Sequence, residues 1–514
     1  MKFCLSFLSL VILTTALMLA TPRDTLVVAV ENEPDRINPI FSEDHDAAIG
    51  MIFSGLLRFD EDRKLVPDLA ESWEVDSSGL VYDFVLKEKI KWHDGVGFGA
   101  QDVAFTLEAV KNPKFNSPLN VNFEMIEKVE ILSQHKIRIT LSSPYPAFLD
   151  SLTLGILPKH LLDQKDLNTD PFNFAPIGTG PYVFKQWKRG QHMSLVANTN
   201  FYLGKVETPK IILKTISNPS LASVELKNGK IDVALVDFEL ASSFQDQSEF
   251  KLLLLESADY RALMFNLKKP IFRSKSVRAA LNYAVDKESI VQGLLHSYGF
   301  VAHHPLQLSW ADSAEYPTYS YDQQKALKML KQEGWEKNQD GILQKGDQTL
   351  SFEIYVMSDD PLRVSLASIL KSEFAKIGVQ AKVVAKPSGS FDYTAVDTFL
   401  VGWGTPFDPD FHTYRVFSSF GDTDKNPEGW NFGHYADQRV DESLSSARVV
   451  FDLEKRKEHY ANFIKAIYEN PPFIFLSYLT FPLVHASNIT GIKPRIVGHH
   501  GVGFTWNIWQ WSKK

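Results

Sequence analysis

Cysteine is almost absent from this 514-residue chain, and its scarcity excludes several kinds of protein. The single cysteine, Cys4, precedes an uncharged apolar run that extends from Leu5 to Leu19. Because this run has the pattern of an export signal, we expect Cys4 to be missing from the mature chain. A chain without cysteine has no disulfide bonds, no thiolate metal site and no lipid-bearing cysteine, so its fold depends on the core.

Long hydrophobic runs are also missing beyond the N-terminal segment. Within that segment, Lys2 precedes the apolar run, and Ala20 ends it before polar sequence begins. The run is short for a membrane span and has the length of a signal peptide's apolar region. We expect residues 1–20 to be a signal peptide cleaved near Ala20, and the mature protein to be periplasmic and not a lipoprotein. Cleavage after Ala16 and an uncleaved anchor are the alternatives.

The chain also lacks an excess of basic residues. The formal net charge is −8, and it becomes −9 when Lys2 leaves with the signal segment (−8 − 1 = −9). This sign argues against nucleic acid and anionic membranes as partners. Hydrophobic residues make up 44% of the chain, as in a well-packed globular protein. Because 514 residues are too many for one core, two or three domains are expected.

Catalytic signatures are missing as well. The chain has no Gly-x-Ser-x-Gly nucleophile turn and no His-Glu-x-x-His pair. The segment Gly178-Thr179-Gly180 has neither the lysine nor the spacing of a phosphate-binding loop. We therefore expect no enzymatic activity and no resident cofactor.

Apolar patterning predicts an α/β protein. Strands are expected at 25–30, 82–86, 89–93, 136–141, 230–236 and 379–384, with an extended run at 259–267. Helices are expected at 47–57, 101–110, 276–296, 322–333, 361–377 and 436–470. Short alternating strands cluster between 65 and 145, which indicates a small α+β domain inserted into the α/β framework.

The most distinctive segment is 401–414, with the sequence VGWGTPFDPDFHTY. Turn-forming glycine and proline around a large aromatic ring build a rigid lip that carries the ring. We expect Trp403, Phe407 and Tyr414 to line a ligand-binding cleft. For Trp403, ordinary core packing is the alternative.

Several phrases follow one another along the mature chain: LVPDLAESW (65–73), KIKWHDG (89–95), QDVAF (101–105), IGTGPY (177–182), VRAALNYAVD (277–286) and GWGTPFDPD (402–410). In their order and spacing they resemble family 5 of the extracellular solute-binding proteins, the nickel and peptide receptors of ABC importers. The resemblance implies a two-lobed periplasmic binding protein of the class II, cluster C type, with an extra small α+β domain inserted in lobe one. Two segments, near 258–262 and 480–487, would cross between the lobes.

The resemblance also implies a division of the chain and a mode of action. Lobe one would comprise 21–59, 171–257 and 483–514, with the inserted domain at 60–170 and lobe two at 258–482. A ligand would be enclosed between the lobes by hinge closure and delivered to inner-membrane ABC permease subunits. The receptor is expected to act as a monomer.

The solute is a separate question. Peptide-binding members of the family hold the ligand's ammonium with an aspartate just after the tryptophan of the 400s segment. Here Thr405 follows the Gly-Trp-Gly phrase, and no acid appears before Asp408. The residue pattern of this segment is closer to that of the nickel-binding branch. One nickel-branch pattern has a histidine directly after Asp-Pro. Here that position is Asp410, and His412 lies two residues further, which leaves the role of His412 open.

The candidate metal ligands are His499, His500 and His45. The histidine pair lies in VGHHGVG, where flanking glycines free the backbone to turn both imidazoles toward one cavity. His45 follows the first strand, where the resemblance implies ligand contact. Neutral imidazoles suit Ni²⁺, Cu²⁺ or Zn²⁺, with water or an organic chelator at the remaining positions.

The leading hypothesis is therefore capture of nickel, as a histidine-type chelate. A di- or oligopeptide receptor is the alternative, and for the histidine pair an incidental exposed loop is the other interpretation. A second pair, His303–His304, is expected in a rim or surface loop.

Overall fold

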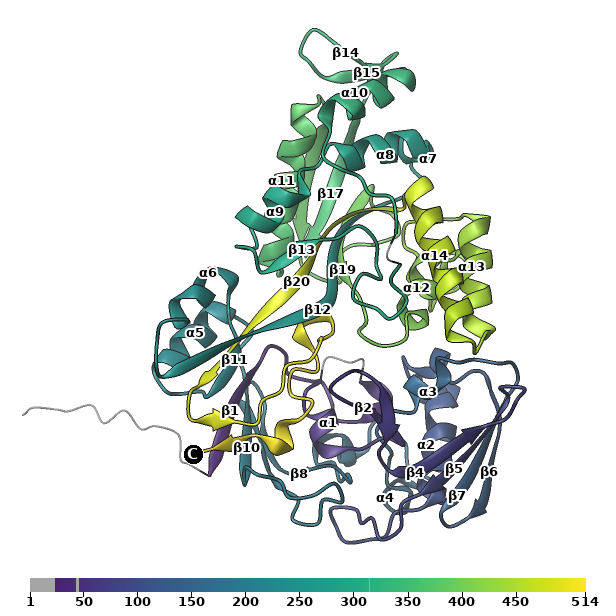
Figure 1. The fold of residues 1–514 in the computed structure, drawn as a ribbon, viewed down its shortest axis with the longest axis vertical. Helices are drawn as coiled ribbons and strands as arrows, with labels where there is room; N and C mark the ends of the chain where they lie inside the picture. Colours follow the sequence, from purple (N-terminus) through teal and green to yellow (C-terminus); the bar gives the residue numbers. More distant parts are fainter. Residues whose placement is uncertain (1–23, 43–45, 314) are drawn as a thin grey trace, which may run out of the picture.

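The computed structural model describes residues 24–42, 46–313 and 315–514 (Figure 1). The expected signal peptide with its cleavage near Ala20, and the candidate ligand His45, lie outside these residues. Within the described part of the chain, no helix is both long and apolar enough to cross a membrane.

A mixed 11-stranded sheet extends through both halves of the molecule (Figure 1). Its two longest strands, β12 (Phe250–Phe265) and β20 (Phe473–Ala486), pair antiparallel at its centre. The register shifts between Glu256 and Tyr260, and such an interruption bends and twists a strand. The crossing segments expected near 258–262 and 480–487 lie on these strands, so the sheet itself connects the two halves.

One half of the sheet continues from β20 in the order β11 (Val233–Leu235), β1 (Thr25–Val30), β10 (Lys210–Thr215), β9 (His192–Ala197) and β8 (Tyr182–Lys188). The continuous apolar run of β1 is buried and pairs parallel with β10. Short elements accompany this half: α1 (Ile49–Ile52), β2 (Leu57–Phe59), β3 (Leu65–Pro67), α5 (Pro219–Lys227) and α6 (Phe238–Ala241). The C-terminal tail returns here through β21 (Ile489–Thr490) and β22 (Ser512–Lys513).

A separate four-stranded antiparallel sheet lies between β3 and β8 in the chain. Its order is β4 (Ala70–Val75), β5 (Val81–Leu86), β7 (Lys136–Leu141) and β6 (Ile126–Ser133), accompanied by α2 (Ala100–Lys111), α3 (Phe148–Ser151) and α4 (Lys159–Leu162). Buried residues of this unit, such as Phe84 and Phe148, belong to one hydrophobic cluster with Leu26 and Val28 of β1. The small α+β unit therefore shares a core with the β1 half.

The other half of the sheet continues from β12 through β19 (Thr398–Trp403), β17 (Ser351–Met357) and β18 (Gln380–Lys386), while β13 (Gly299–Val301) pairs with β20. Its helices are α7 (Pro270–Arg273), α8 (Lys275–Tyr283), α9 (Lys287–Gly293), α10 (Gln323–Gln332), α11 (Pro361–Lys376), α12 (Asp410–Phe417), α13 (Gln438–Val449) and α14 (Leu453–Glu469). A small hairpin sheet of β14 (Glu336–Lys337), β15 (Leu343–Lys345) and β16 (Gln348–Thr349) completes this half. Most of its core lies in two hydrophobic clusters that are separate from that of the β1 half.

Several expected elements differ from those observed. The helix expected at 436–470 divides into α13 and α14, because Asp452 accepts a hydrogen bond from the Lys455 amide and caps a new helix. Asp286 divides the helix expected at 276–296 in the same way, by capping α9. The helix expected at 47–57 is only the four residues of α1. The strand expected at 89–93 is only a short bridged segment, in which Lys91 pairs antiparallel with Gly97 after a turn at Lys89, where φ is +64°.

Candidate ligand-binding cleft

A cavity of about 680 Å³, called the cleft below, lies between the two halves of the molecule. One wall comes from the α1 region, the segment around Thr153 and the tail loop that carries the histidine pair. The facing wall comes from the end of β19, from α11 and from α12. The residues on which the argument depends are Asp46, Arg363, Trp403, His412, His499 and His500. Segments far apart in the sequence therefore meet at one enclosed space.

Both candidate histidines of the tail contribute to the cleft wall. His500 has φ of +54° and is followed by Gly501 at +74°, so the backbone makes the left-handed turn that glycine accepts most readily. The turn brings the rings of His499 and His500 together, with centroids 4.0 Å apart. A regular strand would have pointed them to opposite faces.

Each imidazole has a carboxylate at its Nδ1 atom. His499 Nδ1 lies 3.0 Å from Asp259 Oδ2, and His500 Nδ1 lies 3.3 Å from Glu31 Oε2. A carboxylate beside Nδ1 favours the tautomer with the ring proton on that atom, which leaves the lone pair on Nε2. This is the tautomer that a metal-binding imidazole needs, and its orientation is set by the neighbouring acid.

Burial keeps His499 in its neutral form. It lowers the pKa of His499 to about 3, and the opposing influence of Asp259 does not restore it. Burial acts in the other direction on Asp259, yet Arg261 and His499 hold the pKa of this carboxyl well below its usual range. A neutral imidazole beside an ionised carboxylate is therefore the state of this pair at neutral pH.

The histidine loop, residues 497–501, is hydrogen-bonded to β12 where the register of that strand shifts. Asp259 lies on β12, is fully buried, and also accepts a 3.1 Å hydrogen bond from the His500 amide. Ser257, two residues earlier, donates through Oγ to the Gly498 carbonyl at 2.9 Å, and the Ala258 amide donates to Val497 at the same distance. The histidine loop is thus hydrogen-bonded directly to β12 at three consecutive residues.

The facing wall carries Trp403 and His412. Trp403 lines the cleft, and its ring centroid lies 5.8 Å from that of His412. His412 is buried, and its Nε2 lies 2.7 Å from the Tyr260 hydroxyl. Burial lowers the pKa of His412 to about 3. Since its Nε2 is already engaged, His412 has the environment of a structural histidine.

Phe407 joins the two walls, whereas Tyr414 lies elsewhere. Phe407 lines the cleft and stacks on Phe59 of β2 with ring centroids 4.3 Å apart. Tyr414 stacks on Phe420, lies under the Arg448 guanidinium, and is not among the residues that line the cleft. Of the three aromatic candidates, the structure brings two to the cleft.

Two arginines beside the cleft were not anticipated from the sequence. Arg363 of α11 lines the cleft, is 5% exposed, and pairs with Asp360 at 2.8 Å. Its guanidinium and that of Arg261 lie against Gly402, where any side chain would collide with both. Burial lowers the pKa of Arg363 to about 10, so it remains cationic at neutral pH. The sequence signal for this contact was Gly402 in the GWG phrase, because a glycine leaves room for neighbouring side chains.

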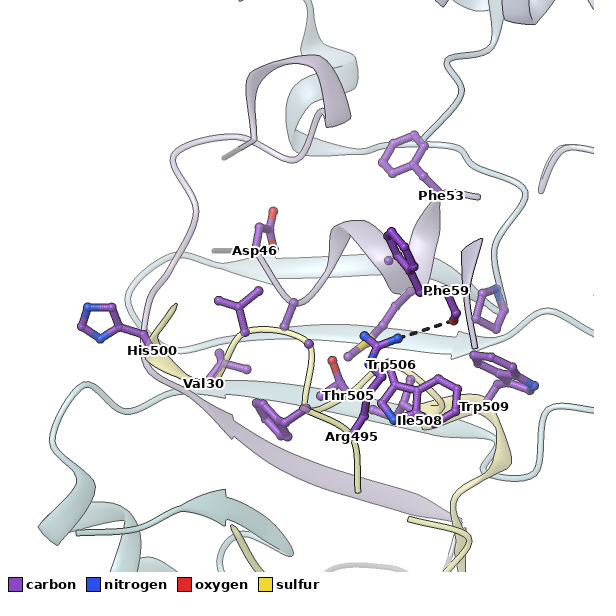
Figure 2. Close-up of a pocket in the computed structure, with 18 of the residues that line it drawn as sticks. Val30, Asp46, Phe53, Phe59, Arg495, His500, Thr505, Trp506, Ile508 and Trp509 are labelled. Carbon is purple, nitrogen blue, oxygen red and sulfur yellow. Dashed lines mark hydrogen bonds between the residues drawn. The ribbon is translucent and has the colours of Figure 1, made fainter. Parts of the chain in front are cut away.

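A second cavity of about 340 Å³ adjoins the cleft (Figure 2). Both cavities are lined by Asp46, Phe407 and His500, among others, and we call the second one the side chamber. Its other walls come from β1, β2 and the C-terminal tail, including Arg495, Trp506 and Trp509 in Figure 2. His500 therefore stands at the junction of the two spaces.

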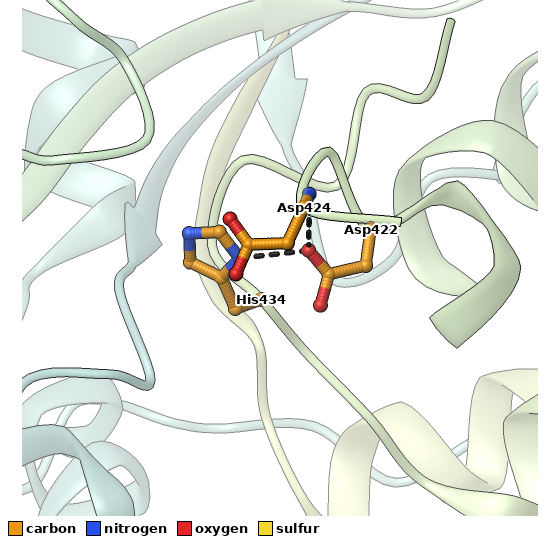
Figure 3. A group of neighbouring side chains, drawn as sticks. All are labelled: Asp422, Asp424 and His434. Atoms are coloured by element: carbon orange, nitrogen blue, oxygen red, sulfur yellow. Dashed lines mark hydrogen bonds and ion pairs between the residues drawn. The ribbon is translucent and has the colours of Figure 1, made fainter. Parts of the chain in front are cut away.

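Other histidines lie away from the cleft. Asp422, Asp424 and His434 have potential ligand atoms within 4.8 Å of one another (Figure 3). His434 Nδ1 contacts Asp422 at 2.8 Å, while Asp424 pairs with Lys268, so these groups already form an ion-pair network. The expected surface position of the pair 303–304 is wrong for His304, which is 1% exposed.

Replacement of His412 by glutamine is expected to reduce acid sensitivity. The unfolded chain gains a proton near pH 6.5, whereas folded His412 gains one only near pH 3. Stability is therefore full above pH 6.5 and is lost as the pH falls through this window, by about 2 kcal/mol at pH 5. Denaturant unfolding of His412→Gln from pH 4 to 8 should show a shallower loss. His459→Gln, on α14, is the matched control, and equal slopes in all three proteins would contradict the assignment.

Comparisons with known proteins identify a family and solved structures that share this architecture. Residues 64–424 match the family described as bacterial extracellular solute-binding proteins, family 5 Middle. The chain is 59% identical to NikZ from Campylobacter jejuni, solved in complex with Ni(L-His), with a TM-score of 0.90 over 96% of this chain and 100% of that one. It is 29% identical to the oligopeptide-binding protein AppA from Bacillus subtilis, over 95% of this chain and 91% of AppA. The AppA structure with a nonapeptide gives a TM-score of 0.82 at 28% identity, over 95% and 99% of the two chains.

These similarities extend over nearly the whole chain and confirm the two-lobed α/β architecture that the sequence phrases predict. The family match alone spans both halves of the central sheet and the small α+β unit. The chain belongs to family 5 of the bacterial extracellular solute-binding proteins.

Proposed function

We propose that this protein is the periplasmic receptor of an ABC importer that captures nickel as a histidine-type chelate. The supporting similarity is to NikZ, which is 59% identical and was solved with Ni(L-His). Exported after removal of residues 1–20, the receptor acts as a monomer and delivers its ligand to inner-membrane permease subunits. Hydrolysis of ATP belongs to those partners, because the receptor contributes binding and not chemistry.

The observation that carries the proposal is the orientation of His499 and His500 at the cleft. Each ring has a carboxylate at Nδ1, which is the arrangement that prepares Nε2 for a metal ion. Borderline divalent ions such as Ni²⁺ favour imidazole ligands. His45 is the proposed third ligand. Two or three protein imidazoles leave further positions on nickel for an amino-acid chelator.

The cleft also has a place for the chelator's carboxylate. Arg363 faces the cleft from lobe two, opposite the histidine loop of lobe one. A guanidinium is well suited to a carboxylate because its donors match the two oxygens. A chelate bound between His499 and Arg363 would therefore contact both lobes. Contacts of this kind favour the closed state over the open one, which is how a ligand drives hinge closure.

A peptide receptor is the second candidate, supported by the similarity to AppA. A bound peptide would need an ionised acid for its ammonium group. Asp46 is a carboxyl at the cleft, but burial raises its pKa to about 7, so it is only half ionised at neutral pH. Asp408 does not serve either, because it forms a buried ion pair with Arg456 at 2.7 Å. The cleft favours the metal chelate.

Calorimetry on the metal-stripped mature protein tests the choice of ligand. We expect tight 1:1 binding of nickel premixed with L-histidine, and no heat from dipeptides of alanine and glycine. X-ray scattering on the same samples should show a smaller radius of gyration with the chelate. Binding of dipeptides together with silence toward nickel–histidine would reverse the assignment within the family.

A further inference from the structure

The side chamber is built from aromatic and aliphatic walls. Trp506 and Trp509 of the tail face Phe59 of β2 across it, and Phe201 packs edge-on against Trp509 with centroids 6.0 Å apart (Figure 2). At about 340 Å³, it is the size of a small-molecule site. Apolar walls of this kind hold the side group of a ligand and not a bare metal ion.

Two guanidinium groups line this chamber, those of Arg58 and Arg495. Among the described residues, no carboxylate oxygen lies within ion-pair distance of Arg58 or Arg495, and the Nε atom of each is buried without a hydrogen-bond partner. Arg495 makes a 3.4 Å hydrogen bond to the Phe59 carbonyl and lies 4.9 Å from the Trp506 ring centroid. Asp68 and Asp60 act on Arg58 and Arg495 only from beyond ion-pair distance, so donors of both guanidinium groups remain available to an anion.

Three carboxyl groups also line the chamber, those of Glu31, Asp46 and Asp68. Glu31 contacts His500 Nδ1 at 3.3 Å, and Asp46 accepts a hydrogen bond from the Ala48 amide at 2.8 Å. Asp68 is also engaged by the Tyr202 hydroxyl. Arg495 keeps its proton at neutral pH, because burial lowers its pKa only to about 10. The acids therefore have partners of their own, and the two guanidinium groups keep unused donors inside the chamber.

We propose that the side chamber is a second ligand subsite, which takes an apolar or aromatic group ending in a carboxylate. The group is either joined to the metal chelate at His500 or lies beside it as a separate molecule. The carboxylate would be held by Arg495 and Arg58, and the aromatic walls would enclose the side group. This inference rests on the proposed function, since it adds to what is bound at the histidine pair.

Calorimetry with three probes tests the subsite: nickel with L-histidine, nickel with the dipeptide His-Phe, and 3-phenylpropionate without metal. In His-Phe the amine and imidazole chelate nickel, while the phenyl group and the terminal carboxylate extend away from the metal. We expect the wild-type protein to bind nickel–His-Phe or phenylpropionate. Arg495→Met should weaken that binding about tenfold or more, because a charge-assisted hydrogen bond is lost.

The variants also distinguish a failure of the subsite from a failure of the proposed function. Arg58→Met should act in the same direction as Arg495→Met, and Arg273→Met, at an exposed arginine of α7, is the matched control. Nickel–histidine binding should be unchanged in all three variants, which also shows that each is folded. Binding of phenylpropionate alone indicates a separate molecule, and binding of nickel–His-Phe alone indicates a joined group. Rejection of both probes by the wild type, or wild-type affinity in both chamber variants, overturns the subsite. Failure of nickel–histidine itself would instead overturn the proposed function.

Discussion

Replacement of both His499 and His500 by alanine is expected to weaken binding of nickel–histidine by at least about a hundredfold. Loss of a single outer partner of a metal ligand costs 10–100-fold in affinity, and here two ligands themselves are removed. Neither ring is part of a hydrophobic core cluster, so the melting temperature of the metal-free variant should stay close to that of the wild type. Calorimetry gives the affinity, and circular dichroism gives the melting temperature.

A matched control distinguishes these rings from histidines elsewhere. His434→Ala removes a histidine that also has a carboxylate at Nδ1 but lies outside the cleft. Its nickel–histidine affinity should equal that of the wild type. If the His499 and His500 variant kept wild-type affinity, or if His434→Ala lost it, the ligands would have to be sought elsewhere.

The second large effect is expected from Asp259→Asn. An amide cannot hold the proton on His499 Nδ1 as a carboxylate does, so nickel–histidine affinity should fall about 10–100-fold. The same change leaves Arg261 buried without its ion-pair partner, which costs about 3–5 kcal/mol of folding free energy. Affinity and stability should therefore fall together in this variant.

Two comparisons separate the role of Asp259 from general destabilisation. Asp359→Asn changes an exposed carboxylate near α11 and should alter neither quantity. Arg261→Met removes the other member of the buried pair and should reduce stability, with a smaller effect on affinity because His499 keeps its acid. Equal losses of affinity in Asp259→Asn and Arg261→Met would show that only stability is involved.

Much of the fold follows from local pattern. The β1 run, the helix at α2 and the strand at β7 lie where apolar periodicity predicts them, because each is set by neighbouring residues. The breaks at Asp286 and Asp452 were missed, although an aspartate three residues before an amide it can cap is a readable helix start. Helical pattern alone does not show where one helix ends and the next begins.

The candidate site likewise has a part that local sequence predicts and a part that it does not. The turn that presents His499 and His500 follows from their flanking glycines, which are adjacent in sequence. Asp259 is 240 residues away from its partner, and only the crossing of β12 past the tail brings the two together. Two charged residues, Asp259 and Arg261, within a buried extended run were a signal that polar groups pack against them. Nothing in the sequence indicates that the tail loop with the histidine pair is the neighbour of Asp259.

The most direct test of the central claim is anomalous diffraction at the nickel edge from crystals of the protein grown with nickel and L-histidine. A nickel position about 2.1 Å from the Nε2 atoms of His499 and His500 is expected, at the length of a metal–imidazole bond. The same map would show whether His45 is the third ligand. A peak at Asp422, Asp424 and His434 instead, or a cleft that holds a peptide and no metal, would contradict the account.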